Sequence, residues 1–384
     1  MRTEPEERSL LQRIRRAIVY ITYLAVVTTA LSATAAWVLL RTARQTISET
    51  VALEGDWLFD ESAQWGLRLA PNVSASYAEP ARQLAFHIYT DPRGLRVDAP
   101  GVRVDGPVDV LVVGGSFFFG WGVEAEDSVS ERLARRTGLR VANAATPAVG
   151  TASAAAAVER LGELSPRLVV YGIIDDHVRR NGCPCAAAIS PLCLAQPYLT
   201  ASDTGDVRWH APVSSTLAPI GGMTRAYPEL MDDGISLAGM YWALRSAAGL
   251  AYRRVALPCA SDAADQGAML HAALDRLVAS AGDARTLVVY VPPLSGAAPS
   301  GAVPAAQLAA RVDLRYLDLT RRVRSYLRAG DGAAPRLSLL DDLHPNPTGH
   351  ELIAAAICTE LVAMGAVPRD TTPATPVYCL TPER

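Results

Sequence analysis

An uncharged run of 24 residues, Ala17 to Leu40, restricts the fold of this chain more than any other feature of its sequence. A helix rises about 1.5 Å per residue, so the run spans about 36 Å and covers the ~30 Å hydrocarbon core of a bilayer. Arg13, Arg15 and Arg16 precede it, and basic residues are fewer on its C-terminal side. An excess of cationic residues marks the cytoplasmic side of a membrane helix. We therefore predict a transmembrane anchor over residues 17–40, with residues 1–16 in the cytoplasm.

A cleaved signal peptide is the alternative interpretation of this run, because Ala33-Thr34-Ala35 resembles a small-residue cleavage site. The apolar run continues to Leu40, further than the core of a signal peptide requires, and this favours an uncleaved anchor. Both interpretations export the rest of the chain. The predicted location is the cytoplasmic membrane, crossed once, with the residues beyond the anchor in the periplasm or outside the cell.

The six cysteines all follow the anchor, and an even number in an exported region indicates disulfide bonds. Six cysteines allow 15 pairings, and sequence alone does not choose among them. We predict one bridge between Cys358, in a C-terminal helix, and Cys379, in the tail at 366–384. A zinc site at Cys183, Cys185 and Cys193 is the alternative, but these residues lack C-x₂-C spacing and a neighbouring pair of histidines.

Between residues 108 and 365, short apolar runs alternate with helical patterns, as in a parallel sheet covered by helices on both faces. The predicted strands are 110–113, 139–143, 168–174, 286–291 and 316–319. The predicted helices are one capped at 127–128 and ending near 136, then 151–164, 265–281, one ending near 328, and 348–364.

Two further sections complete the predicted organisation. Residues 182–258 interrupt the alternation and are too long for a simple crossover, so we interpret them as an insertion that forms a lid or a substrate-binding subdomain. Residues 45–107 form a membrane-proximal section. Within it, Asp91-Pro92 and Gly94 predict a turn between two short strands, and hence a small β appendage.

The first predicted strand of the alternating region runs directly into Gly114-Gly115-Ser116. Glycines allow the backbone to turn sharply there and to expose a hydroxyl at the C-terminal end of the strand. In open α/β sheets, that end is where ligands bind. The spacing is not the G-x-S-x-G elbow of α/β-hydrolases, because Phe118 stands where a glycine is needed. Ser116 is nevertheless a candidate nucleophile.

A second candidate group lies in the segment Leu340 to His350, where Asp341 and His344 have D-x-x-H spacing. A hydroxyl becomes a good nucleophile when a base takes its proton, and the imidazole needs an acceptor that fixes its tautomer. Asp341 and His344 can fill those two roles for Ser116, with Asp342 as an alternative to Asp341. A helix-capping Asp beside a surface His is the other interpretation of the pair.

These residues resemble the SGNH/GDSL esterase superfamily in four blocks over residues 108–365. The blocks are Gly114–Gly120, in which Gly115 replaces the usual Asp, then Asn143–Thr151, Tyr171–His177 and Asp341–His344. The resemblance implies a flavodoxin-like three-layer α/β/α sandwich. It also implies ester chemistry by a Ser-His-Asp triad.

The resemblance further implies an oxyanion hole. Ser116 would contribute a backbone N–H, and the family's glycine in the second block aligns with Ala148, with Gly150 as the nearby alternative. Asp175 occupies the position of the family's asparagine, and an ionised Asp can only accept hydrogen bonds. Loss of one oxyanion donor typically costs ~2.7–4 kcal/mol of transition-state stabilisation. Our hypothesis is that Asp175 is buried and partly protonated, or that backbone donors bypass it.

Other histidines are weaker candidates on the sequence. We expect His87 to be structural, His177 to lie in a solvated turn after the third strand, and His350 to be exposed on the last helix. Net charge is −3 and the pI is about 6.1, which gives no electrostatic reason to expect a nucleic-acid partner. The sequence suggests no cofactor and no metal site.

The predicted function is therefore that of an exported, membrane-anchored serine esterase that acts on an acyl, above all an acetyl, ester. The location and the resemblance together point to envelope polysaccharide as a substrate class. Two alternatives stay open at this point: an O-acetyltransferase on envelope polysaccharide, and a non-catalytic envelope binding module with a degenerate site.

Overall fold

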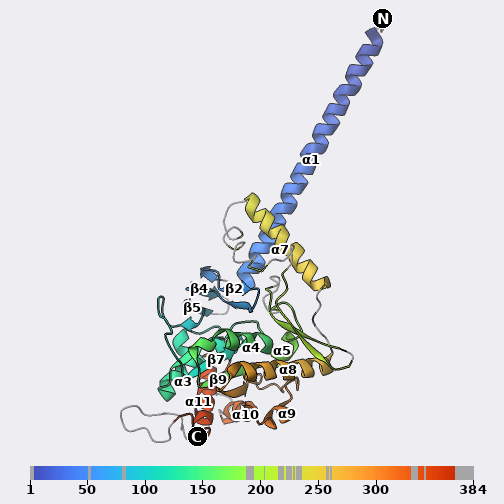
Figure 1. The fold of residues 1–384 in the computed structure, drawn as a ribbon. Helices are drawn as coiled ribbons and strands as arrows, with labels where there is room; N and C mark the ends of the chain where they lie inside the picture. The colour runs from blue at the N-terminus through green and yellow to red at the C-terminus, as the bar shows by residue number, and fades with distance from the viewer. Residues whose placement is uncertain are drawn as a thin grey trace.

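The computed structural model describes residues 4–50, 53–79, 84–186, 194–202, 204–214, 220–221, 227, 230, 236–256, 259, 262–329, 336–340 and 343–367. Among them, strands from both halves of the chain form one nine-stranded sheet with the order β1-β4-β5-β6-β8-β7-β9-β12-β13. Figure 1 shows this sheet below a long N-terminal helix that rises away from it.

The parallel part of the sheet confirms the predicted strands. It consists of β7 (Val110–Gly114), β8 (Val141–Asn143), β9 (Leu168–Ile173), β12 (Arg285–Tyr290) and β13 (Arg315–Asp318). Every residue of β7 and β9 is buried, as expected for strands that are covered on both faces.

The strands of the membrane-proximal section continue this sheet instead of forming a separate appendage. They are β1 (Leu53–Gly55), β4 (Ser74–Glu79), β5 (Leu84–Thr90) and β6 (Arg96–Val97), all antiparallel, and β6 pairs with β8. The predicted turn connects β5 and β6. A separate hairpin of β2 (Phe59–Ser62) and β3 (Gly66–Leu69) lies beside them.

The three layers follow from the alternation of side chains along β7. Val110 and Val112 point into a core shared with α3 (Val129–Thr137) and α11 (Pro347–Ala363). Leu111 and Val113 point into a second core with α4 (Thr151–Arg160) and α8 (Ala263–Ala281). Both cores bury large aliphatic side chains, and this burial is the main stabilising term for the sandwich.

The remaining short elements connect these layers. They are α2 (Ser116–Phe119), η2 (Ala125–Asp127), η3 (Gly162–Leu164), α5 (Asp175–Arg180), α9 (Ala305–Ala309) and α10 (Thr320–Ala329).

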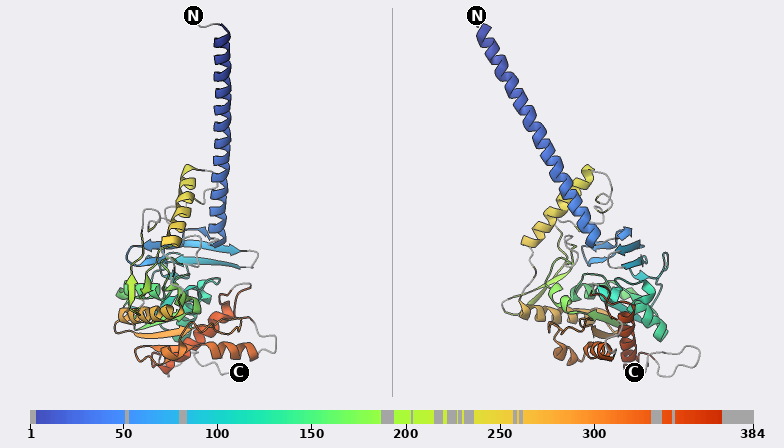
Figure 2. Two further views of the ribbon diagram at one scale, coloured as in Figure 1. Left: turned by 90° about the vertical axis from the view of Figure 1, so that its right-hand side faces the viewer. Right: turned by 180° about the vertical axis from the view of Figure 1, so that it is seen from behind.

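The N-terminal helix α1 (Glu4–Thr50) contains a stretch, Gln12–Thr42, that is long and apolar enough to cross a membrane. Only 6% of its most apolar window is buried against the protein, and all but its C-terminal end stands free of the globular part in both orientations of Figure 2. A signal sequence would satisfy the same criteria of length and composition, so both interpretations of this run remain compatible with the structure.

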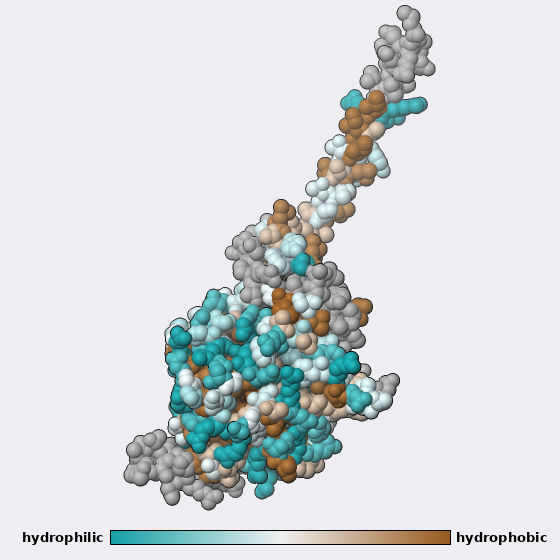
Figure 3. All heavy atoms as spheres, viewed as in Figure 1, coloured by the Kyte–Doolittle hydropathy of each residue, from teal (hydrophilic) through white to brown (hydrophobic). Residues whose placement is uncertain are grey.

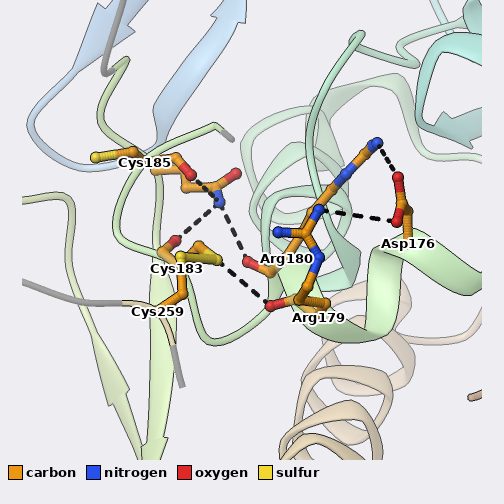
Figure 4. Close-up of a disulfide and its surroundings, with 7 residues drawn as sticks. Asp176, Arg179, Arg180, Cys183, Cys185 and Cys259 are labelled. Carbon is orange, nitrogen blue, oxygen red and sulfur yellow. Dashed lines mark hydrogen bonds and ion pairs between the residues drawn. A yellow bond between two sulfur atoms is a disulfide. The ribbon is translucent and has the colours of Figure 1, made fainter. Parts of the chain in front are cut away.

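The insertion contains a hairpin of β10 (Tyr198–Ala201) and β11 (Val207–His210), which packs on α8, and the helix α7 (Leu237–Ala256), which packs on α1. A disulfide joins Cys183 to Cys259 and so ties the start of the insertion to its end (Figure 4). Cys185 is also disulfide-bonded, which rules out the zinc alternative for this pair of cysteines. Cys358 is disulfide-bonded as well, but its predicted partner Cys379 lies outside the described residues.

Candidate active site

Ser116 lies at the carboxyl end of β7, where the strand turns into the short helix α2. Gly114 has φ +145°, and a Cβ there would lie 2.7 Å from the carbonyl oxygen of Gly172 on the neighbouring strand. Only glycine fits this combination of dihedral angle and close backbone approach. The chain can therefore turn immediately after the buried strand and present the Ser116 hydroxyl at the edge of the sheet.

The Ser116 hydroxyl and the His344 imidazole are in direct contact. Oγ of Ser116 lies 2.8 Å from Nε2 of His344, although the two residues are 228 positions apart in the sequence. A backbone bridge between Ser338 and Pro345 closes the loop that carries His344, and the Leu339 N–H donates to the His344 carbonyl oxygen at 2.9 Å. The loop thus holds the imidazole next to the hydroxyl before any ligand binds.

Aromatic side chains flank the half-buried His344 ring. The Phe117 ring is 5.4 Å from it and the Trp121 ring 6.5 Å, measured between centroids. Trp121 in turn packs edge-on against Tyr77 and Phe86 of the antiparallel strands. One wall of the site therefore comes from the membrane-proximal part of the sheet. The predicted orienting acid Asp341, and its alternative Asp342, lie outside the described residues.

The loop before α4 carries the predicted backbone donors Ala148 and Gly150. Ala148 has φ +68°, a left-handed conformation that favours glycine. Gly150 is the N-cap of α4. In the part of the chain that the structure describes, the N–H groups of Ser116, Ala148 and Gly150 donate to no acceptor. Arg180 steadies this loop by donating to the Val149 carbonyl at 3.3 Å.

Asp175, at the start of α5, is half-buried and has both carboxylate oxygens engaged. Oδ1 accepts from the Tyr290 hydroxyl at 2.8 Å, and Oδ2 accepts from the Ser300 N–H at 2.8 Å. Burial, together with the Asp175 carboxylate, raises the pKa of Tyr290 well above its usual range, so the phenol stays a donor. Asp175 thus connects α5 to β12 and the loop that follows it, and it is less buried than we expected.

His177 does not lie in a solvated turn. It is the third residue of α5 and only 1% exposed, and its ring lies against the backbone of Gly115. Burial lowers the pKa of His177 well below its usual value, with a further contribution from Arg180, so the imidazole is neutral. The expectation failed because this segment is the helix α5, in which His177 is buried while the preceding residue Asp176 is exposed.

A chain of hydrogen bonds holds the ring of His177 in place. The Asn181 Nδ2 group donates to Thr151 Oγ1 at 3.3 Å, because Asn181 Oδ1 already accepts from the Ala152 N–H. Thr151 Oγ1 lies 2.7 Å from Tyr171 Oη, and Tyr171 Oη lies 3.0 Å from His177 Nδ1. Among the described residues, one direction of the chain leaves the His177 Nε2–H without an acceptor, and the other leaves the Thr151 hydrogen without one. The chain therefore fixes the position of the ring, with Nε2 facing Gly115, in either tautomer.

Sequence reasoning missed Arg96, which fixes the backbone that follows Ser116. Its fully buried guanidinium donates to the carbonyls of Phe119, Gly120 and Val123 at 2.5–2.6 Å and stacks on the Phe119 ring at 4.5 Å. Burial lowers the pKa of Arg96 to about 10, while Glu124 opposes this shift, so the group stays charged at neutral pH. No motif marks an arginine in a two-residue strand, so nothing in the sequence pointed to it.

The other histidines have structural surroundings. His87 is exposed and pairs with Glu124 at 3.0 Å. His350 is fully buried, contrary to our expectation, because α11 packs against α3 along the face that carries it. Among the described residues, no group of three or more His, Cys, Asp or Glu side chains is placed to hold a metal ion.

Comparisons with known proteins give only remote matches. No protein-family model and no curated protein matches the chain. A G-D-S-L family lipolytic protein from Desulfitobacterium hafniense aligns with 12% identity and a TM-score of 0.30, over 65% of this chain and 96% of its own. An acetyl xylan esterase from Butyrivibrio proteoclasticus aligns with 11% identity and a TM-score of 0.31, over 69% of this chain and 67% of its own.

A family two carbohydrate esterase from Clostridium thermocellum aligns with 9% identity and a TM-score of 0.34, over 82% of this chain and all of its own. With TM-scores this low, these similarities are too remote to assign a function. The functional proposal below therefore rests on the contact between Ser116 and His344.

Proposed function

We propose that the protein is an exported, membrane-anchored serine esterase. The observation that carries this proposal is the 2.8 Å contact between Ser116 Oγ and His344 Nε2 at the carboxyl edge of a parallel sheet. A serine hydroxyl that is hydrogen-bonded to an imidazole nitrogen is the arrangement that general-base activation requires. The N–H groups of Ser116, Ala148 and Gly150 support the proposal, because they donate to no acceptor among the described residues and backbone N–H groups can stabilise an oxyanion.

In the proposed reaction, His344 Nε2 takes the proton of the Ser116 hydroxyl while Oγ attacks the carbonyl carbon of an acyl ester. The carbonyl oxygen becomes negative and accepts hydrogen bonds from the backbone donors. The tetrahedral intermediate collapses, the alcohol leaves with the proton from His344, and an acyl-enzyme remains. Water, deprotonated by His344, then releases the acid. Asp341 is proposed to orient the imidazole, on the basis of the sequence alone.

Asp175 takes no part in this scheme. Both of its oxygens are already engaged, because they accept hydrogen bonds from the Tyr290 hydroxyl and the Ser300 N–H. The proposed oxyanion hole therefore consists of backbone groups. The aromatic wall of Phe117 and Trp121 beside His344 favours a small acyl group such as acetyl, and envelope polysaccharide is the proposed alcohol component.

Covalent labelling tests this proposal directly. The full chain in detergent is treated with a fluorophosphonate, which reacts only with an activated serine, and p-nitrophenyl acetate hydrolysis is measured in parallel. We expect labelling and turnover in the wild type, and at least a ~10³-fold lower rate in Ser116→Ala and His344→Ala. Ser202→Ala, in the remote β10–β11 hairpin, is the matched control and should behave like the wild type.

Equal labelling of the wild type and Ser116→Ala would refute the nucleophile. A labelled protein that does not hydrolyse the ester, yet acetylates an added oligosaccharide, would identify a transferase. No labelling of any variant would leave the binding module as the remaining interpretation.

A further inference from the structure

The helix α7 has one buried face and one exposed apolar face. Gly239 and Ala243, four positions apart, are buried. Leu237, Tyr241 and Leu244 are exposed by 82%, 52% and 60%. Their spacing of four and then three residues places them in one stripe along the helix. Exposed leucines in a continuous stripe are uncommon on a water-facing helix and mark a contact surface.

This stripe lies next to the proposed membrane anchor. The helix α7 rises from the globular part beside α1 in the views of Figures 1 and 2, and its N-terminal end is the end further from the sheet. Trp242 and Ala243 of α7 belong to the same apolar cluster as Leu39 and Leu40 of α1. Figure 3 shows hydrophobic residues along α1 and around its base.

The level of the bilayer surface on α1 follows from three residues. Leu40 is 1% exposed, so the globular part begins to cover α1 there. Arg41 lies over the Trp37 ring at 5.2 Å. Tryptophan and arginine near the end of an apolar helix are typical of the membrane–water interface. The packing of α7 on this end of α1 therefore brings the exposed stripe to the depth of the headgroups and upper acyl chains.

We propose that Leu237, Tyr241 and Leu244 insert into the same bilayer that α1 crosses, on its exported side, and that lipid is the partner of this face. Arg245 fits this arrangement, because it donates to the Tyr241 hydroxyl at 2.7 Å and can hold its charge at the headgroup level. The stripe then fixes the rotation of the globular part about the anchor. This inference depends on the proposed anchoring role of α1.

Photocrosslinking of the full chain in vesicles of phosphatidylethanolamine and phosphatidylglycerol tests the proposal. A benzophenone side chain replaces Leu244, and separate proteins carry it at Ile21 of α1 or at Val312. Ile21 is 65% exposed on α1. Val312 is fully exposed and follows α9 by three residues, and α9 lies at the end of the globular part opposite α1 in Figure 1. We expect lipid adducts from positions 244 and 21 and none from position 312.

The outcomes separate this inference from the anchoring itself. Lipid adducts from position 21 but not from 244 would overturn the role of α7 and leave the anchor intact. Chain-to-chain adducts from position 244 would show that a second copy covers the stripe, and would also overturn it. Absence of lipid adducts at position 21 would refute the anchor, and with it this inference.

A second variant tests the apolar character of the stripe. Leu237→Glu/Leu244→Glu changes only exposed side chains, so the fold and the hydrolysis of a soluble ester should be unchanged. With the benzophenone at position 241, we expect these charges to reduce the yield of lipid adducts at least several-fold. An unchanged yield would show that the stripe does not need to be apolar, and would contradict insertion.

Discussion

The imidazole of His177 lies so close to Gly115 that a Cβ at residue 115 would be 2.4 Å from Nε2. The buried ring occupies the space that any side chain at residue 115 would need. The hydrogen-bond chain from Thr151 through Tyr171 holds the ring there.

Gly115→Ala should therefore destabilise the protein and lower its esterase activity. The backbone of Gly115 has φ −90°, which alanine adopts freely, so the cost is steric and of the order of 1–3 kcal/mol. Thermal unfolding in detergent and p-nitrophenyl acetate hydrolysis measure the two effects. His177→Ala should relieve the clash, so the double variant should lose at least ~1 kcal/mol less stability than the sum of the single variants. Simple additivity would contradict a direct contact.

Ala148→Gly should stabilise the protein. A non-glycine residue in the left-handed region destabilises the folded protein by about 1–3 kcal/mol, and glycine removes this strain. Glycine also has more freedom in the unfolded chain, which destabilises the folded protein by about 0.5–1 kcal/mol. With φ +68° at Ala148, we expect a net gain of about 1 kcal/mol, seen as a higher unfolding midpoint. Ala152→Gly, inside α4, is the matched control and should lower the midpoint. If both variants lower it, Ala148 is not strained.

Asp175→Asn should keep most of the wild-type activity. Asparagine can accept from the Ser300 N–H with its oxygen and donate to the Tyr290 hydroxyl with its nitrogen, so both contacts survive. Asp175→Ala removes both and leaves the buried Tyr290 hydroxyl unpaired, which should cost about 1–3 kcal/mol of stability. A ~10²-fold rate increase in Asp175→Asn would contradict this account, because it would mean that the new amide donates to the oxyanion.

His350 should make stability depend on pH in the acid range. Burial, assisted by the positive charges of Arg96 and Arg132, lowers its pKa from 6.5 to about 3. The unfolded chain binds a proton below pH 6.5, whereas the folded protein does not until about pH 3. The free energy of unfolding should therefore be highest above pH 6.5 and should decrease as the pH falls from 6.5 towards 3, by up to ~1.4 kcal/mol per pH unit.

Unfolding midpoints between pH 4 and pH 7 measure this effect for the wild type and His350→Gln. The variant should show a shallower dependence, because glutamine does not titrate. Carboxylates contribute equally to both proteins and cancel in the comparison. Parallel curves would show that His350 is not the group responsible.

The parallel half of the fold was readable from the sequence because its strands are buried on both faces. Such strands appear as continuous apolar runs, as in Val110–Val113 and Leu168–Ile173, and no knowledge of their neighbours is needed to recognise them. The pairing of β6 with β8 was not readable. It rests on a single pair of residues, Arg96 and Asn143, that are distant in the sequence and carry no pairing signal.

Part of the candidate site could be predicted from the sequence as well. Ser116 and His344 stood out because a glycine turn and a D-x-x-H spacing are local patterns, and the structure brings them into contact. The surroundings of His177, His350 and Asp175 were not predictable, because burial and hydrogen-bond partners depend on elements that pack from elsewhere in the chain. Histidine in particular has no preferred exposure, so its sequence neighbours say little about it.

The strands before and after residue 108 belong to one sheet, so the residues that follow 108 do not form an independent domain. A truncated chain that began there would leave the edge of β8 open as a template for aggregation, and it would lack the Arg96 guanidinium that holds the carbonyls after Ser116. A fragment that lacks the apolar stretch of α1 and keeps the whole sheet has to begin upstream of β1. Substitutions in the antiparallel strands β4 to β6 are therefore expected to damage the candidate site as readily as substitutions beside Ser116 itself.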